Sequence, residues 1–181
     1  FIYGFIRESR PNVVVETGVL HGLTSAWILK ALEDNKKGRL ISIDLPRRDW
    51  DKHFKGIHFG KGGDSELEIK NEHPGWVIPK KLKERWDLTL GPSQTYLPKV
   101  CAEQKNIDLF IHDSDHSYDT MKTECELVNK YHPNSNIIID DYYLNDYASD
   151  FQIKIGKDMI EIEEINDNLE KVRGFAFFLN K

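Results

Sequence analysis

Short apolar runs and segments of helical spacing alternate along most of the chain. Five of the runs are too short for helices and end in polar or glycine residues, and they lie at 13–15, 40–43, 86–90, 107–111 and 136–139. Near-continuous apolar strands with polar carboxyl ends are typical of a parallel sheet that is covered on both faces. Apolar residues recur at helical spacing between them, at roughly 24–34, 93–104 and 117–131. The alternation predicts β-α-β units and an α/β fold.

Two more strands are predicted near the end of the chain, at Met159–Ile165 and Arg173–Leu179, with a short turn between them. A short connection joins antiparallel strands, so we expect a C-terminal hairpin containing one antiparallel strand. The predicted fold is therefore a Rossmann-like, doubly wound, mostly parallel sheet of about seven strands. With 181 residues the chain can bury one core, so 1–181 is predicted to be a single domain. Because the chain begins at Phe1, an N-terminal piece is expected to be missing.

The stretch 45–85 interrupts this alternation with five glycines, three prolines and many charged residues. Long loops in compact domains are usually functional or disordered. Four aromatic residues give this one apolar surface for packing, and they are Trp50, Phe54, Phe59 and Trp76. We therefore predict a lid or substrate loop.

Composition and charge narrow the classes of partner. The chain has 39% hydrophobic residues, a net charge of −5 and no block of basic residues, so no nucleic-acid partner is expected. No apolar run approaches the roughly 20 residues of a membrane-spanning helix, and no secretion leader is visible. These features predict a cytoplasmic protein with a small-molecule partner and no membrane contact. The two cysteines, Cys101 and Cys125, are expected to be buried thiols.

Polar residues gather where the predicted strands end, which is where open parallel sheets bind ligands. Gly18 and Gly22, in the turn after the first strand, let a ligand approach the backbone. Thr24 or Ser25 can cap the helix that follows. The glycine spacing is not the G-x-G-x-x-G fingerprint of dinucleotide-binding proteins. Asp44 ends the second strand, where a carboxylate can accept both hydroxyls of a ribose, so a nucleotide-like ligand is one interpretation of this pattern.

The segment "IHDSDHSYD", residues 111–119, concentrates acids and histidines after the fourth strand. If the fourth and fifth strands are neighbours, Asp113 and the pair Asp140 and Asp141 project into one crevice. Three carboxylates there repel one another, so without a cation at least one should have a strongly raised pKa. Such oxygen ligands suit Mg²⁺. The alternatives are a solvated acidic rim and a zinc site built on His112 and His116.

Five segments together carry a resemblance to a known family. They are "VVVETGVLHGLTS", "RLISIDLP", "GWVIPKKLKERWDLTLGPSQTYLP", "IDLFIHDSDHSYDTMKTECEL" and "NIIIDDYYLND". In this order they resemble class I S-adenosylmethionine-dependent methyltransferases. The similarity is greatest to small-molecule O-methyltransferases that include macrocin-type sugar methyltransferases and the cephalosporin hydroxylase and rhamnosyl methyltransferase group. It spans about residues 11–150.

The resemblance implies that S-adenosylmethionine is the methyl donor and that the ends of the first three strands bind it. The matching positions are Glu16, Gly18 and Gly22 for its methionine part, Asp44 for its ribose, and Gly91 and Ser93 for its adenine. In metal-dependent members, the positions equivalent to Asp113, Asp140 and Asp141 bind Mg²⁺. Asp115 is the implied general base, off the metal, and His116 is its rival.

These features predict a Mg²⁺-assisted O-methyltransferase acting on a hydroxyl of a small polar acceptor, for which a sugar or glycosylated metabolite is one candidate. Methyl transfer from a sulfonium is an in-line displacement, so the acceptor must be positioned and its hydroxyl activated. The alternatives are a nicotinamide-dependent oxidoreductase, against which the glycine spacing argues, and a non-catalytic cofactor-fold domain of a larger protein. A homodimer is one candidate oligomeric state. "HPNSN" stands where the family commonly has a proline-glycine-glycine turn, so the acceptor side is expected to differ.

Overall fold

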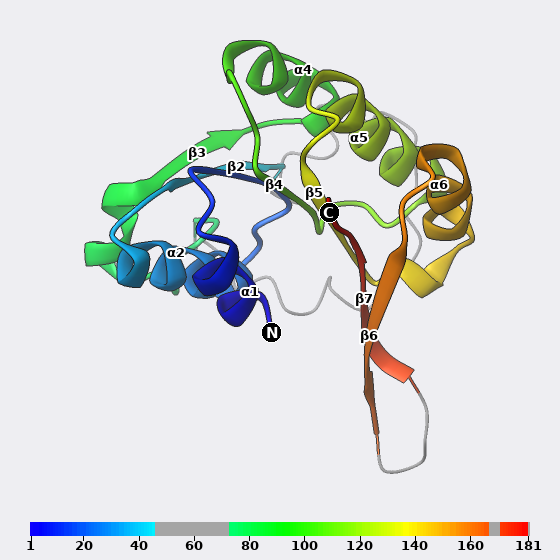
Figure 1. Cartoon of the computed structure of the whole chain (residues 1–181). Coiled ribbons are helices and arrows are strands. Elements are labelled where there is room, and N and C mark those ends of the chain that lie inside the picture. The colour runs from blue at the N-terminus through cyan, green and yellow to red at the C-terminus, as the bar shows by residue number, and fades with distance from the viewer. Residues whose placement is uncertain (46–72, 167–170, 181) are drawn as a thin grey trace.

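The computed structural model of the chain describes residues 1–45, 73–166 and 171–180. Within these residues a seven-stranded sheet forms the centre of the molecule (Figure 1). Its strands in chain order are β1 (Val13–Thr17), β2 (Arg39–Asp44), β3 (Trp86–Leu90), β4 (Leu109–His112), β5 (Asn136–Asp140), β6 (Met159–Ile165) and β7 (Lys171–Phe178). Across the sheet they follow the order β3-β2-β1-β4-β5-β7-β6.

The topology creates a crevice beside the central strand. β1 pairs in parallel with both β2 and β4, while β7 lies antiparallel between β5 and β6. The chain builds the sheet outward from β1 to β3 and then switches to the other side with β4. Ligands of open α/β sheets bind at such a switch point, beyond the carboxyl ends of the strands. The predicted doubly wound, mostly parallel sheet with an antiparallel hairpin is confirmed.

Helices cover both faces of the sheet (Figure 1). α1 (Ile2–Ser9) and α2 (Leu23–Asn35) lie on one face, and α4 (Ser93–Glu103), α5 (Tyr118–Tyr131) and α6 (Tyr147–Ile155) lie on the other. Neighbouring residues of β4 point to opposite faces, so Ile111 packs in the core beneath α1 and α2, and Phe110 packs in the core beneath the other helices. This two-sided burial explains the near-continuous apolar runs.

The predicted helices are present, and each end lies within one residue of its expected position. The sequence pattern does not predict α1 and α6, because they bury only two and three residues respectively. Such short helices give too few apolar positions for a period to be recognised. Two 3₁₀ segments, η3 (Lys80–Arg85) and η4 (Tyr142–Leu144), complete the described elements.

The predicted lid falls largely outside the described residues, which omit 46–72. Its described end forms a turn and η3, which lead directly into β3. This end packs against the turn after β1, because a Cβ on Gly22 would lie 2.6 Å from the Cα of Gly75. No helix in the described part of the chain is both long enough and apolar enough to cross a membrane.

Candidate functional site at the strand ends

Glu16, near the carboxyl end of β1, is fully buried. Its Oε2 accepts hydrogen bonds from the hydroxyls of Ser25 (2.7 Å) and Ser42 (2.8 Å). Its Oε1 has no hydrogen-bond partner among the residues that the structure describes. Burial raises the pKa of Glu16 to about 7 against the opposing effect of the two hydroxyls, and the charge of Asp44 adds to the rise. A buried carboxylate oxygen of this kind indicates a place for a donor or a cation.

The turn after β1 packs tightly against the loop after β4. Gly18 has a φ of +85°, and a Cβ there would lie 1.9 Å from the carbonyl oxygen of Asp113. Only glycine fits both the backbone conformation and this contact. The packing places the acidic segment after β4 directly beside the turn that was predicted to bind the cofactor.

The start of α2 differs from its prediction. Gly22, with a φ of 89°, is the N-cap, and no side chain caps this helix. The expected capping role of Thr24 or Ser25 is wrong, because both residues lie inside the first turn and the Ser25 hydroxyl donates to Glu16 instead. Their contact with a cofactor stays a prediction.

The ends of β2 and β3 meet at the same crevice. Asp44 Oδ1 accepts two backbone N–H groups of the turn after β1, at 2.7 and 3.2 Å. The Gly91 N–H donates to the Asp44 carbonyl at 2.8 Å. Ser93 is buried at the start of α4, and its hydroxyl hydrogen-bonds to Glu124. Asp44 therefore holds the turn after β1 in place and also borders the crevice. The Ser93 hydroxyl, by contrast, is already hydrogen-bonded to Glu124.

Asp113, His116 and Asp140 form a compact group whose candidate ligand atoms all lie within 4.8 Å of one another. Asp140 is 4% exposed, and the Asp113 side chain is 25% exposed. Burial raises the pKa of Asp113 well above its ordinary value, and the negative charges of Asp140 and Glu16 add to the rise. The raised pKa expected of clustered carboxylates is thus confirmed. The low exposure of Asp140 argues against a solvated acidic rim.

Arg173, on β7, compensates part of this negative charge. Its guanidinium donates to Asp140 Oδ2 at 3.3 Å and lies over the ring of Phe175, 4.9 Å from the ring centre. Asp140 Oδ1 is buried and has no hydrogen-bond partner within the described ranges. Asp140 is therefore held through one oxygen, and the other remains a candidate ligand atom.

Two of the predicted acids lie outside this group. Asp141 follows β5 in a left-handed conformation with a φ of 47°, and burial and then the charge of Asp140 raise its pKa. Asp115 is exposed, and its Oδ2 accepts hydrogen bonds from the hydroxyls of Ser117 (2.6 Å) and Thr120 (2.8 Å) at the start of α5. Their roles as metal ligand and general base stay predictions.

His112, the last residue of β4, forms a buried pair with Glu124, with 2.8 Å between Nδ1 and Oε2. Glu124 also accepts hydrogen bonds from the hydroxyls of Thr17 (2.6 Å) and Ser114 (3.0 Å). Burial opposes ionisation, but His112 and the hydroxyls together lower the pKa of Glu124. No three-residue ligand group in the described ranges contains both His112 and His116, so the zinc alternative lacks support.

Sequence reasoning missed Glu124 and Arg173. Glu124 lies on the buried stripe of α5 beside Cys125 and Val128, and an acid on such a stripe is a signal that the sequence does contain. Arg173 has no comparable signal. Its position beside Asp140 depends on the pairing of β5 with β7, which no local pattern reveals.

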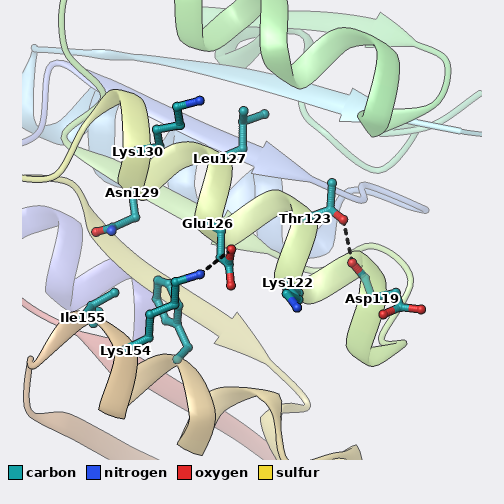
Figure 2. Close-up of a pocket in the computed structure, with 10 residues that line it drawn as sticks. Asp119, Lys122, Thr123, Glu126, Leu127, Asn129, Lys130, Lys154 and Ile155 are labelled. Carbon is teal, nitrogen blue, oxygen red and sulfur yellow. Dashed lines mark hydrogen bonds and ion pairs between the residues drawn. The ribbon is translucent and has the colours of Figure 1, made fainter.

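A separate groove of about 640 Å³ lies between α5 and α6 (Figure 2). Residues of both signs line it, and Lys154 forms an ion pair with Glu126 across it at 2.6 Å. None of the strand-end residues described above lines this groove. The candidate site therefore remains at the strand ends.

Comparisons with known proteins identify the family of the chain. Residues 15–142, more than half of the chain, match the family described as "Methyltransferase domain". No curated protein matches the sequence.

Solved structures share the fold at low sequence identity. A protein from Klebsiella pneumoniae, described as a proposed O-methyltransferase, has a TM-score of 0.66 and 14% identity over 100% of this chain and 79% of its own. An O-methyltransferase from Bacillus cereus in complex with SAH has a TM-score of 0.62 and 13% identity over 99% and 79%. The O-methyltransferase TomG from Streptomyces achromogenes in complex with SAM has a TM-score of 0.63 and 14% identity over 99% and 78%. The neighbours establish the fold, and the match over residues 15–142 establishes that this chain belongs to the methyltransferase domain family.

Proposed function

We propose that this protein transfers the methyl group of S-adenosylmethionine to a hydroxyl oxygen of a small polar acceptor, assisted by a divalent cation such as Mg²⁺. The observation that carries the proposal is the convergence of Glu16, Asp44 and the Asp113–Asp140 pair at the carboxyl ends of four strands in one sheet. Family membership supports methyl transfer. Two structural neighbours crystallised with SAM or SAH support this donor.

Glu16 and Asp44 give the donor side of the crevice its negative charge. S-adenosylmethionine carries a sulfonium and an ammonium group, and the buried Oε1 of Glu16 can accept a hydrogen bond from such an ammonium. A bound cation would favour the ionised form of Glu16 and so lower its raised pKa. Asp44 ends β2, where its carboxylate would accept ribose hydroxyls. Gly18 and Gly22 allow the turn to pack closely against Asp113 and Gly75, and the proposed donor contacts at this turn are made by its backbone.

Asp113 and Asp140 fit a divalent cation. The Oδ1 atom of Asp140 is buried without a hydrogen-bond partner in the described residues, and the pKa of Asp113 is raised by the neighbouring acids. A cation would relieve both conditions. Mg²⁺ takes oxygen ligands, so the two carboxylates would hold it and the His116 imidazole would stay outside its ligand set. The ion would supply positive charge that lowers the pKa of the acceptor hydroxyl.

His116 is the proposed general base. Its Nε2 lies 3.8 Å from Asp113 Oδ1, so its ring borders the acid group. The Asp115 carboxylate is instead engaged by two hydroxyls at the start of α5. An imidazole beside the acid group would accept the proton of the acceptor hydroxyl while the methyl group is transferred in line.

The acceptor is proposed to be a small molecule, with a sugar or glycosylated metabolite as one candidate. A cytoplasmic location and a homodimer stay predictions. The nicotinamide alternative loses support, because the family match is to methyltransferases.

Calorimetry tests the donor and the metal separately. We expect S-adenosylmethionine to bind and NAD not to bind. Asp113→Asn should weaken Mg²⁺ binding while leaving S-adenosylmethionine binding nearly intact, because the proposed donor contacts come mainly from the first three strands. Turnover with a panel of hydroxylated acceptors, free sugars included, then tests transfer. Failure of S-adenosylmethionine to bind would refute the proposal, and activity that survives EDTA would remove the metal from it.

Two variants test the base. His116→Gln should lower turnover on the order of 10²-fold or more while S-adenosylmethionine and Mg²⁺ still bind. Asp115→Asn should have a much smaller effect. The opposite pair of results would assign the base to Asp115.

A further inference from the structure

His112 carries a buried ring nitrogen that the fold leaves without a partner. The side chain is 0% exposed, and its Nδ1 is 2.8 Å from Glu124 Oε2. Its Nε2 is also buried and has no hydrogen-bond partner among the described residues. Buried polar atoms without partners destabilise a fold and are rare, so this one calls for an explanation.

Glu124 fixes the orientation of this ring. Hydroxyls of Thr17, Ser93 and Ser114 hydrogen-bond to its carboxylate, in addition to the contact with His112. An ionised carboxylate only accepts hydrogen bonds, so the contact requires Nδ1 of His112 to carry the shared proton. In the neutral imidazole this tautomer makes Nε2 an acceptor.

The ring of His116 is the neighbour of the His112 ring on the side of the acid group. The two ring centres lie 5.7 Å apart, and the rings are nearly perpendicular at 86°. His116 in turn has its Nε2 3.8 Å from Asp113 Oδ1. The structure thus contains a continuous series from the buried Glu124 through two imidazoles to the acid group.

We propose that His112, held by Glu124, is a positioning residue that orients the His116 ring against Asp113 through one bridging water, from which its Nε2 accepts a hydrogen bond. This inference rests on the proposed function, because the orientation of the His116 ring affects catalysis only if His116 is the general base. A residue that hydrogen-bonds to the second ring nitrogen of a functional histidine fixes the tautomer and the ring orientation of that histidine. This hydrogen bond also gives the buried Nε2 of His112 the partner that it lacks among the described residues.

Two substitutions test the roles of the two ring nitrogens of His112 separately. His112→Asn places an amide near the position of Nδ1, which preserves the contact with Glu124, and leaves nothing at the position of Nε2. His112→Gln places its amide near the position of Nε2. Ser114→Ala is the matched control, because it removes a hydrogen bond to Glu124 and leaves both histidines in place. All three are made in the full chain, and thermal unfolding tests whether each folds.

The first measurement is the ¹⁵N and ¹H spectrum of the His116 ring, recorded without donor or acceptor. We expect the ring signals to shift in His112→Asn toward those of an unrestrained imidazole, and to stay near wild type in His112→Gln and Ser114→Ala. If His112→Asn does not fold, His112→Gln alone decides. Its His116 signals should match wild type, and a shift as large as that of a free imidazole would overturn the proposal.

The second measurement is turnover. His112→Asn should lower kcat on the order of 10- to 100-fold with little change in the KM for S-adenosylmethionine, and His112→Gln should restore most of it. Equal behaviour of His112→Asn and Ser114→Ala in both measurements would overturn the proposal. If the wild type shows no turnover at all, the proposed function fails, whereas the ring spectra still decide whether His112 positions His116.

Discussion

Replacing Glu16 with glutamine should remove a large part of the pH dependence of stability between pH 4.5 and about 7. The fully buried Glu16 has a pKa raised by burial from 4.5 to about 7. In that interval the folded protein keeps a proton on this side chain, whereas the unfolded chain has lost it. The stability that this proton contributes is therefore fully present below pH 4.5 and is lost as the pH rises through about 7.

The size of the effect follows from the shift. A rise from 4.5 to about 7 is about 2.5 units, and each unit corresponds to about 1.4 kcal/mol. Glu16 should thus cost the wild type about 3 kcal/mol of stability between pH 4.5 and pH 8, a loss that Glu16→Gln avoids. Asp113 changes the stability with pH in the same direction, because its pKa is also raised, in part by the charge of Glu16.

Urea unfolding of wild type and Glu16→Gln at several pH values between 4.5 and 8 measures this difference. The glutamine amide adds a donor where Oε1 lacks a partner, which should destabilise the variant by a constant amount at every pH. The quantity to compare is therefore the change with pH in the difference between the two free energies of unfolding. A difference that stays constant over the range would refute the assignment of a raised pKa to Glu16.

Three further predictions concern the same crevice. Gly18→Ala should be far more destabilising in urea unfolding than Gly156→Ala, because both have a positive φ but only Gly18 meets another backbone atom, the Asp113 carbonyl oxygen; equal losses would mean that φ alone matters. Asp44→Ala should weaken S-adenosylmethionine binding by about 1.5 to 3 kcal/mol in calorimetry, since the ribose hydroxyls lose a charged acceptor, and unchanged affinity in a folded variant would remove Asp44 from the site. Asp115→Ala should lower the free energy of unfolding by about 1 kcal/mol, because the hydroxyls of Thr120 and of Ser117, the N-cap of α5, lose the carboxylate oxygen that accepts their hydrogen bonds; a variant as stable as wild type would show that these contacts do not stabilise α5.

The elements that the sequence predicts are those whose signal is local. Four of the five parallel strands, β1, β2, β4 and β5, are buried on both faces and appear as near-continuous apolar runs, whereas the edge strand β3 is only partly buried. Their polar ends lie together for a topological reason, because the carboxyl ends of parallel strands share one edge of the sheet. Glu16, Asp44, Asp113 and Asp140 could therefore be grouped from the sequence before any contact was known.

The elements that escape prediction depend on tertiary contacts. α1 and α6 bury too few residues to show a period. The capping residue of α2 was expected to be a hydroxyl, but the chain needs that hydroxyl to satisfy the buried carboxylate of Glu16, and Gly22 adopts the required backbone conformation instead. Spacing along the chain does not distinguish these two uses of Ser25.

The same limit applies to the division of roles after β4. Asp115 and His116 are adjacent in sequence, and the family resemblance gave the acid priority. The start of α5 decides between them, because Ser117 and Thr120 turn the Asp115 carboxylate toward the helix while His116 borders Asp113. A general base must face the reacting group, so the two hydroxyl contacts of Asp115 make His116 the better candidate.

Arg173 compensates only part of the negative charge of Asp113 and Asp140. It places one positive charge on Asp140, and the pKa of Asp113 remains well above its ordinary value in its presence. One guanidinium is thus too little for the acids that meet at this crevice, and the raised pKa favours the protonated form of Asp113. A divalent cation would favour the ionised form instead, so binding of Mg²⁺ should release protons and should strengthen as the pH rises. Calorimetry in buffers of different ionisation enthalpy measures this release, and Mg²⁺ binding without proton release would show that Asp113 is not a ligand.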